Sequence, residues 1–435
     1  DADIRRAQTP PSSWYRSESR WSEVIERVFP HTWHMVGDSG GERGHNVANG
    51  YVWLEPSCIS AGPINEPIVL VHGAAPLILS NVCTHRGNIL VSEPCAATSI
   101  RCSYHGRRFG LDGRCQFMPE FKDVENFPAD ADNLTRLPSG QWAGWLFAAM
   151  TSPTTSFDQW IAPLRERMSY LPLERARFDP TRSRDYTVHA HWALYVENYL
   201  EGFHIPFVHE GLNSVLDWTD YETVLFDRAV LQIGTSKDPA ATFDVPVDHE
   251  DTNRNIAAYY WWLFPNLMIN VYPWGVSMNI VEPVHHSLTR IRYRTYVMDP
   301  TRLETGAGSG LDTVEFADEA VVEAVHRGLQ DLAAAAHGGQ EVHAGVEGGQ
   351  AGLGAAEVQG VEEGTYAVLD ALQPGTAHVD RVVHHHRHPQ GQGGRGAVGR
   401  DVDGHREGLV QHRFGRRVAP QLHRAGAFGL GQGQQ

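Results

Sequence analysis

Two histidines and two carboxylates occur within the thirteen residues Glu197–His209, ENYLEGFHIPFVH. A non-haem iron held by two histidines and one carboxylate needs such side chains, with coordination positions left open for oxygen. His204 and His209 are the candidate ligands, but their spacing places them about 140° apart on one regular helix. Pro206 lies between them and favours a kink or a helix end, which would let both side chains reach one metal. A buried amphipathic helix without metal is an equal alternative for this segment alone.

A second set of potential ligands lies upstream, in the short motifs Cys83–His85 and Cys102–His105. Each motif supplies one thiolate and one imidazole. Two cysteines and two histidines can hold zinc, although zinc sites more often show CxxC or HxxxH spacing. The same four side chains are the ligands of a Rieske [2Fe–2S] centre, in which the cysteines bind one iron and the histidines the other. The other three cysteines fall outside this spacing and are expected to be buried or incidental: Cys58, Cys95 and Cys115.

The residues around this second set predict a small all-β domain. Between Thr32 and Phe147, short apolar runs alternate with glycines, prolines and acidic turns. Asp112-Gly113 is a hairpin turn signal. The chain before this domain is expected to hold a polar arm and a short helix at Ser22–Phe29, capped by Ser22. We therefore place an N-terminal arm and helix at 1–31 and the all-β domain at 32–148.

Residues 149–330 are expected to form a second domain, in which helices flank an antiparallel sheet. Helices are predicted at about 157–171 and 312–330, with several strands between them. The last of these strands, TRIRYRTYVM, alternates arginines with mostly apolar residues, which is typical of a strand with one wet face. The predicted fold class of the whole chain is therefore α+β.

Residues 331–435 have a different composition from the rest of the chain. They hold 22 of the 43 glycines and 10 of the 24 histidines, and no Lys, Ser, Asn, Ile, Met, Cys or Trp. Disorder is the expectation for such a segment. Our hypothesis is a reading-frame error in a GC-rich gene, and a histidine-rich metal-binding tail is the alternative.

Charge and composition exclude several classes of function. The net charge of −16 argues against nucleic-acid binding. Five cysteines are too few for a disulfide-stapled secreted domain of this length. The first residues lack the apolar core of a signal peptide, and prolines and asparagines interrupt the most apolar run, at 259–274, so no membrane span is expected. A soluble cytoplasmic protein is the expectation.

Both constellations resemble one protein family. The motifs CTH and CSYHG, 16 residues apart, are similar to those of Rieske ferredoxins and oxygenases. No cysteine follows either motif where Rieske proteins of respiratory complexes carry a disulfide, which favours the oxygenase type. HWALYVENYLEGFHIPFVH resembles the pattern NWK-x3-EN-x2-D/E-x2-H-x4-H of the large (alpha) subunit of Rieske non-haem iron oxygenases, the ring-hydroxylating dioxygenase and choline monooxygenase-like family. His191 and Ala193 depart from this pattern.

The resemblance implies two metal centres. The [2Fe–2S] cluster is then bound by four side chains, Cys83, His85, Cys102 and His105. The mononuclear non-haem Fe(II) is bound by His204 and His209, and Asn198 lies near it. Glu201 is the bridging carboxylate, which links an iron-ligand histidine to His105 of a neighbouring subunit.

The third iron ligand is expected from the segment FADEAVVEAVHRGLQ, which is similar to the family pattern ED-x4-E-x2-Q-x-GL. This match makes Asp318 the ligand, although Ala317 replaces the first glutamate of the pattern. Helical spacing supports Asp318 independently, because it shares a face with Val321, Val322, Val325 and Leu329. A carboxylate on such a face is costly unless it is paired or bound to metal. The alternative is a carboxylate that only favours the helix dipole.

The implied function is that of a terminal oxygenase whose catalytic domain is of the helix-grip type. Electrons come from an NAD(P)H-dependent reductase or a ferredoxin, and O2 and a small organic substrate react at the iron by hydroxylation or demethylation. A homotrimer is expected, since the electron route of the family crosses a subunit boundary.

The substrate is expected to be a quaternary ammonium compound, since Glu at position 201 resembles the branch that oxidises such compounds. Aromatic side chains could surround its cation; the candidates are Tyr199, Phe203, Trp262, Phe264, Tyr272 and Trp274. Ring hydroxylation is the runner-up, and a non-catalytic Rieske electron-transfer protein is the alternative from another class.

Overall fold

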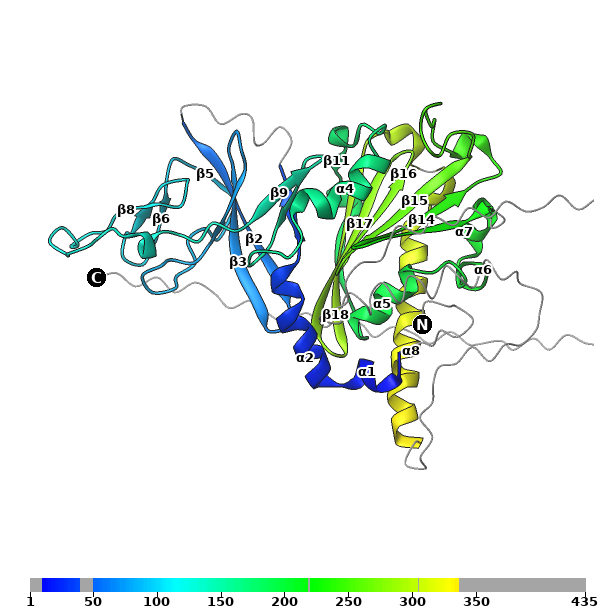
Figure 1. The fold of residues 1–435 in the computed structure, drawn as a ribbon, viewed down its shortest axis with the longest axis horizontal. Helices are drawn as coiled ribbons and strands as arrows, with labels where there is room; N and C mark the ends of the chain where they lie inside the picture. The colour runs from blue at the N-terminus through cyan, green and yellow to red at the C-terminus, as the bar shows by residue number, and fades with distance from the viewer. Residues whose placement is uncertain (1–9, 40–49, 218–219, 304, 336–435) are drawn as a thin grey trace, which may run out of the picture. The chain divides into compact units, whose positions relative to one another are not determined.

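The computed structural model describes residues 10–39, 50–217, 220–303 and 305–335 (Figure 1). The expected disorder or frame error at 331–435 therefore lies outside the described residues, apart from 331–335, which continue the last helix. Among the described helices, none is both long and apolar enough to cross a membrane. The apolar run at 259–274 forms sheet strands instead.

The N-terminal β domain consists of three small antiparallel sheets. One has the order β1-β10-β9, from His34–Asp38, Trp145–Ala148 and Ser139–Trp142. The second has the order β4-β3-β2-β5, from Leu77–Ser80, Ile64–His72, Val52–Ala61 and Cys95–Ala97. The third has the order β6-β7-β8, from Ile100–Arg101, Arg108–Phe109 and Cys115–Phe117. The predicted turn at Asp112-Gly113 joins β7 to β8, and Gly113 adopts the positive φ of 86° that such a turn requires.

The second domain is built on one eight-stranded antiparallel sheet, as expected (Figure 1). Its order is β11-β18-β17-β16-β15-β14-β13, and β12 also pairs with β18. The strands are β11 (Arg177–Phe178), β12 (Arg184–Val188), β13 (Glu222–Phe226), β14 (Ala229–Thr235), β15 (Ile256–Leu263), β16 (Leu267–Tyr272), β17 (Gly275–His285) and β18 (Leu288–Val297). Strand β18 shows the predicted alternation, with half-buried arginines between buried neighbours.

Helices cover both faces of the central strands. They are α1 (Ser12–Arg16), α2 (Glu18–Arg27), α4 (Phe157–Arg167), α5 (Trp192–Tyr199), α6 (Ile205–Val208), α7 (Glu210–Val215) and α8 (Leu311–Ala335). Short 3-10 turns occur at Phe29–His31, Asp130–Asp132, Leu173–Arg175, Pro180–Arg182, Pro239–Ala241, Pro300–Arg302 and Gly306–Gly308. The predicted cap of α2 was wrong: Ser17 accepts a hydrogen bond from the Arg20 N–H, and Ser22 lies inside the helix.

Alternation along β15 explains why this strand is apolar throughout. Trp261 and its alternate neighbours pack with Trp160 of α4 in one core cluster. Trp262 and Phe264 belong to a second cluster with Trp192 of α5. A strand that is buried on both faces has no wet side and reads as a continuous hydrophobic run. The α+β class predicted from sequence is confirmed.

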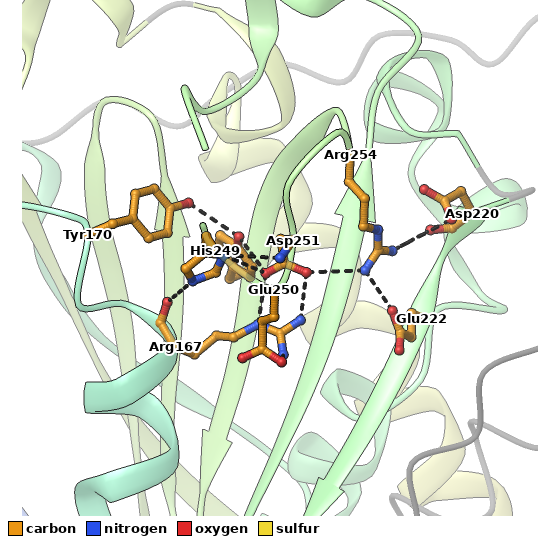
Figure 2. A network of polar contacts seen from close by, with 9 residues as sticks. Arg167, Tyr170, Asp220, Glu222, His249, Glu250, Asp251 and Arg254 are labelled. Carbon is orange, nitrogen blue, oxygen red and sulfur yellow. Dashed lines mark hydrogen bonds and ion pairs between the residues drawn. The ribbon is translucent and has the colours of Figure 1, made fainter. Parts of the chain in front are cut away.

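A buried ion-pair network ties α4 to the sheet (Figure 2). Asp251, whose side chain is 1% exposed, accepts two hydrogen bonds from Arg167, at 2.8 and 2.6 Å. Arg254 approaches the same carboxylate at 3.3 Å and also pairs with Glu222 at 2.7 Å. The Tyr259 hydroxyl of β15 donates to Asp251 at 2.9 Å. A charge buried in this way depends on its partners, because water cannot replace them.

We expect Asp251→Asn to destabilise the catalytic domain by about 3 kcal/mol or more, because Arg167 then keeps a buried charge with a weakened set of partners. Urea denaturation followed by tryptophan fluorescence measures the effect. Asp158→Asn is the matched control: its side chain is 81% exposed and pairs with Arg165, so the change should stay below about 1 kcal/mol. Equal effects of both substitutions would contradict this account.

The N-terminal helix α1 is fastened to α5 by one polar contact. The buried Tyr15 hydroxyl lies 2.7 and 2.9 Å from the two carboxylate oxygens of Glu197. Burial raises the pKa of Glu197 to about 7, and the hydrogen bond from Tyr15 only partly opposes this. The folded state therefore binds a proton on Glu197 more tightly than the unfolded chain, whose glutamates titrate near 4.5.

The stability difference between the wild type and Glu197→Gln should consequently depend on pH. The protonated carboxyl contributes its full stabilisation below pH 4.5, and this contribution is lost as pH rises towards 7. The slope in this window is at most about 1.4 kcal/mol per pH unit. Unfolding free energies measured across the window in both proteins give the difference, and a difference that does not change with pH would refute the proposed linkage.

Candidate metal centres

The two Cys/His motifs form a pair of equivalent backbone turns. In the first, the Cys83 N–H donates to Asn88 and the Gly87 N–H donates back to Cys83, at 2.8 and 2.9 Å. In the second, Cys102 N–H donates to the Arg107 carbonyl and Gly106 N–H to the Cys102 carbonyl, at 2.8 and 3.0 Å. Gly87 and Gly106 both have positive φ, of 72° and 76°. Both motifs therefore form tight loops, and glycine suits both turns because it has no Cβ.

The four side chains of these turns lie next to one another. The rings of His85 and His105 are 4.8 Å apart between centroids. Cys83 and Cys102 are buried, whereas both histidines are partly exposed. Burial opposes ionisation of the Cys102 thiol, but hydrogen bonds from the backbone of Tyr104 and His105 lower its pKa. A thiol prepared in this way suits metal ligation, which requires the thiolate.

These side chains fit a binuclear cluster, in which two cysteines bind one iron and two histidines the other. The buried Nδ1 of His105 has no hydrogen-bond partner, which leaves it available as a ligand. The arrangement suits a cluster with a cysteine side and a histidine side.

Arg107, which the sequence reasoning did not identify, holds the two turns together. Its buried guanidinium donates to the Thr84 hydroxyl at 2.8 Å and pairs with Asp132 at 3.1 Å. Thr84 in turn donates to the Asp132 carbonyl at 2.7 Å. Arg107 follows His105 by two residues, and Thr84 precedes His85. Because its partners lie far away in the sequence, no local sequence pattern predicts that Arg107 connects the two turns.

The second centre forms where the chain leaves α5. His204 lies at the N-terminal end of α6 and His209 at its C-terminal end. Their rings lie 5.0 Å apart between centroids, at 80°. The convergence of the two histidines is as predicted, but the predicted cause was wrong. The helix already ends at Tyr199, and Pro206 lies in the first turn of α6, where proline is tolerated.

Asp318 of α8 meets both histidines. Its Oδ1 atom is 2.9 Å from Nε2 of His209 and 3.5 Å from Nε2 of His204. Asn198 of α5 donates to the same oxygen from Nδ2 at 2.9 Å. One ligand atom from each of His204, His209 and Asp318 lies within 4.8 Å of the others. Two imidazoles and a carboxylate on one side of a site are the donor set of a non-haem iron.

Glu201 contacts the other side of His204. Its Oε1 lies 2.6 Å from Nδ1 of His204, and its Oε2 accepts the backbone N–H groups of Phe203 and His204, at 2.5 and 3.2 Å. Burial alone would lower the pKa of His204, but the hydrogen bond and charge of Glu201, together with the charge of Asp318, raise it. With Nδ1 bound to Glu201, Nε2 is the nitrogen that faces Asp318.

The inner face of α8 differs in part from the predicted one. Asp318 and Val322 face the domain as expected, and Leu329 packs against the same core. Val325 does not, because it is 45% exposed. Glu315 and His326 are buried instead. The inward face is therefore formed by positions 315, 318, 322, 326 and 329, whose spacing of three and four residues matches the helix period. The apolar residues alone predicted a face shifted towards Val325.

The six aromatic candidates divide into two groups. Trp262 and Phe264 belong to the core beneath α5. Tyr272 and Trp274 stack at 5.3 Å between centroids and share a cluster with Ile205 of α6, and Tyr199 packs against this cluster. Phe203 is half-buried in the loop between the two helices. Four of the six candidates are therefore buried core residues, and Tyr199 and Phe203 are the two that are partly exposed.

Two family models match the chain. The model of the ring hydroxylating alpha subunit (catalytic domain) matches residues 175–412, more than half of the chain, and includes the three residues of the second centre. The model of the Rieske [2Fe-2S] domain matches residues 59–128, which contain all four residues of the first centre.

Known relatives agree with these matches. The chain is 28% identical over 349 residues to the chloroplastic choline monooxygenase of Arabidopsis thaliana, covering 76% of this chain and 78% of that protein. It is 29% identical over 306 residues to the carnitine monooxygenase oxygenase subunit of Escherichia coli (strain K12), covering 68% and 76%. A crystal structure of a quaternary ammonium Rieske monooxygenase with L-carnitine superposes with a TM-score of 0.64 at 21% identity, covering 86% of this chain and 97% of that one. This last likeness shows the fold.

Substitution of single cysteines should separate ligands from core residues. We expect Cys102→Ser to lose the visible absorbance and EPR signal of a [2Fe–2S] cluster, because the ligand set needs both thiolates. Cys115→Ser is the matched control: Cys115 is also buried and belongs to the same core cluster, so it should retain the signal. Loss of the signal in Cys115→Ser alone would overturn the assignment.

Proposed function

Because this chain belongs to the ring hydroxylating alpha subunit family and carries a Rieske [2Fe-2S] domain, we propose that it is a terminal oxygenase acting on a quaternary ammonium compound. Members of this family are oxidoreductases that use O2. In addition to the Rieske cluster of the first domain, they hold a mononuclear non-haem iron in the catalytic domain. The extents that we propose for the two domains are 32–148 and 149–330.

The observation that carries the proposal is the meeting of His204, His209 and Asp318, since the last two are separated by 109 positions in the chain. We assign these three side chains as iron ligands and Cys83, His85, Cys102 and His105 as cluster ligands. When bound, the iron supplies the O2-activating chemistry. A purely electron-carrying protein has no use for a second donor set of this kind, so the assembled triad favours an enzyme.

The polar neighbours of the triad orient it. Asn198 donates to Asp318 at 2.9 Å, which holds the carboxylate towards the histidines. Glu201 holds Nδ1 of His204, so that Nε2 is directed at the metal position; such outer hydrogen bonds fix the orientation of a ligating histidine. Glu201 is also the residue that we assign to electron delivery from the histidine side of a cluster in a neighbouring subunit. A homotrimer and a separate reductase or ferredoxin are parts of this proposal.

Two observations favour a cationic substrate. The first is the similarity to choline and carnitine monooxygenases. The second is the pair of partly buried aromatic side chains close to the histidines in sequence, Tyr199 and Phe203, because aromatic faces attract quaternary ammonium groups. Ring hydroxylation is the second candidate, since the same aromatic side chains would also suit a planar ring.

Turnover assays should distinguish the two substrate classes. We expect product from choline, carnitine or another trimethylammonium compound, and none from aromatic acids, when the protein is supplied with O2 and a reductase. Product analysis by mass spectrometry provides the measurement. Exclusive turnover of the aromatic acids would replace the proposed substrate with the ring-hydroxylation candidate.

Glu201→Gln should separate electron delivery from metal binding. We expect it to keep the cluster signal and most of its mononuclear iron but to lose at least about 10- to 100-fold in turnover, as is usual when a partner of a ligating histidine is changed. Glu210→Gln, an exposed glutamate at the start of α7, is the control and should remain active. Wild-type turnover in Glu201→Gln would refute its role, and a wild type without mononuclear iron would refute the enzyme itself.

A further inference from the structure

Helices α5 and α8 are joined by two polar contacts one turn apart. Asn198 of α5 donates to Asp318 of α8 at 2.9 Å. Three residues earlier on each helix, the Tyr195 hydroxyl donates to Glu315 Oε2, also at 2.9 Å. A spacing of three residues puts neighbouring side chains on one helix face. The Tyr195–Glu315 contact thus lies one helix turn before the contact between Asn198 and the proposed iron ligand Asp318.

Glu315 is the centre of a buried network drawn from four elements. Its side chain is 7% exposed and its Oε2 accepts from Tyr186 of β12, Tyr195 of α5 and Asn279 of β17, the last at 2.8 Å. The hydroxyl oxygens of Tyr186 and Tyr195 lie 2.8 Å apart, and Asn279 Nδ2 donates to the Tyr195 hydroxyl at 3.0 Å. The network therefore fixes Glu315 from the sheet and from α5 at once.

Holding α8 through this network costs free energy, because a carboxyl group must be buried. Burial raises the pKa of Glu315 to about 7, and the donated hydrogen bonds only partly oppose this shift. An apolar residue at position 315 would avoid the desolvation of a carboxyl group. A polar network holds its side chains in one arrangement, because its hydrogen bonds are directional. The next turn of α8 needs such a fixed orientation, because the Oδ1 of Asp318 must reach two histidines.

We propose that Glu315 is a positioning residue for the iron centre, which sets the turn of α8 that carries Asp318 against the turn of α5 that carries Asn198. This inference rests on the proposed role of Asp318 as an iron ligand. Among the described residues, Glu315 hydrogen-bonds with Tyr186, Tyr195 and Asn279, and with neither His204 nor His209. It acts through Asp318, three residues later on the same helix.

The other anchors of α8 act elsewhere. Glu323, five residues beyond Asp318, accepts the backbone N–H of His189 at 2.9 Å. Asp312 pairs with Arg184 near the start of the helix, and Val322 packs in the core. These contacts hold α8 against the domain without bonding to the Tyr195–Asn198 turn. Glu323 is therefore the matched control, as a carboxylate of the same helix that makes a hydrogen bond of the same length.

The test compares metal affinity in Glu315→Leu, Glu315→Gln and Glu323→Gln. Each full-length protein is stripped of mononuclear metal and titrated with Co2+, whose visible spectrum reports coordination, while urea denaturation followed by tryptophan fluorescence reports the folding of the catalytic domain. We expect Glu315→Leu to bind Co2+ about 10- to 100-fold more weakly and to show an altered spectrum. Glu315→Gln should restore most of the affinity, because its side-chain oxygen accepts from the same donors and its amide can donate to the unpartnered Oδ1 of Asn279. Glu323→Gln should bind as the wild type does.

Three outcomes would overturn the inference. The first is wild-type affinity and spectrum in Glu315→Leu, and the second is an equal loss in Glu323→Gln, which would show that any anchor of α8 matters. If the catalytic domain of Glu315→Leu fails to fold, Tyr195→Phe replaces this variant, because it removes only one hydroxyl. Wild-type Co2+ affinity in Tyr195→Phe is the third outcome. A wild type that binds no Co2+ at this site would instead refute the proposed function, on which the inference depends.

Discussion

The contact between Asp318 and His209 is the constraint on which the catalytic domain depends. It joins two positions 109 residues apart at 2.9 Å, so every element between them must return the chain to the same place. The antiparallel sheet does this, because β13 to β18 run as consecutive neighbours and end where α8 begins. Burial of both faces of β15 and β16 makes the sheet a fixed base. The core beneath α5 contains residues of α8 as well, and so keeps the two helices together.

Carboxylates concentrated between two helices give the site its chemical character. Glu197 lies in α5 and Glu201 follows it, and Glu315 and Asp318 lie on α8. Each has a defined partner: a tyrosine hydroxyl, an imidazole, the three-donor network or the Asn198 amide. Burying such groups is unfavourable unless partners or a cation compensate. A divalent metal would supply that compensation at Asp318.

The sequence predicted what depends on local spacing and missed what depends on distant contacts. The Cys/His turns and the two histidines could be proposed because their residues come from short motifs. Asp318 was proposed from the resemblance of its segment to the family pattern, which helix periodicity supported. Glu315 could not, since Tyr186, Tyr195 and Asn279 come from three other elements. Arg107 escaped notice for the same reason. Val325 was wrongly placed on the inner face because hydrophobicity was taken as burial, whereas the helix turns the buried Glu315 and His326 inward.

The convergence of His204 and His209 also has a local cause that differs from the one expected. Proline was the expected breaker, yet the chain leaves α5 several residues before Pro206. Glu201 accepts the N–H groups of Phe203 and His204, so its carboxylate fixes the turn of the chain between α5 and α6. The same carboxylate holds Nδ1 of His204 at 2.6 Å. Glu201 thus orients the first histidine of the pair, and the residue assigned to electron delivery is also part of the reason that the ligands meet.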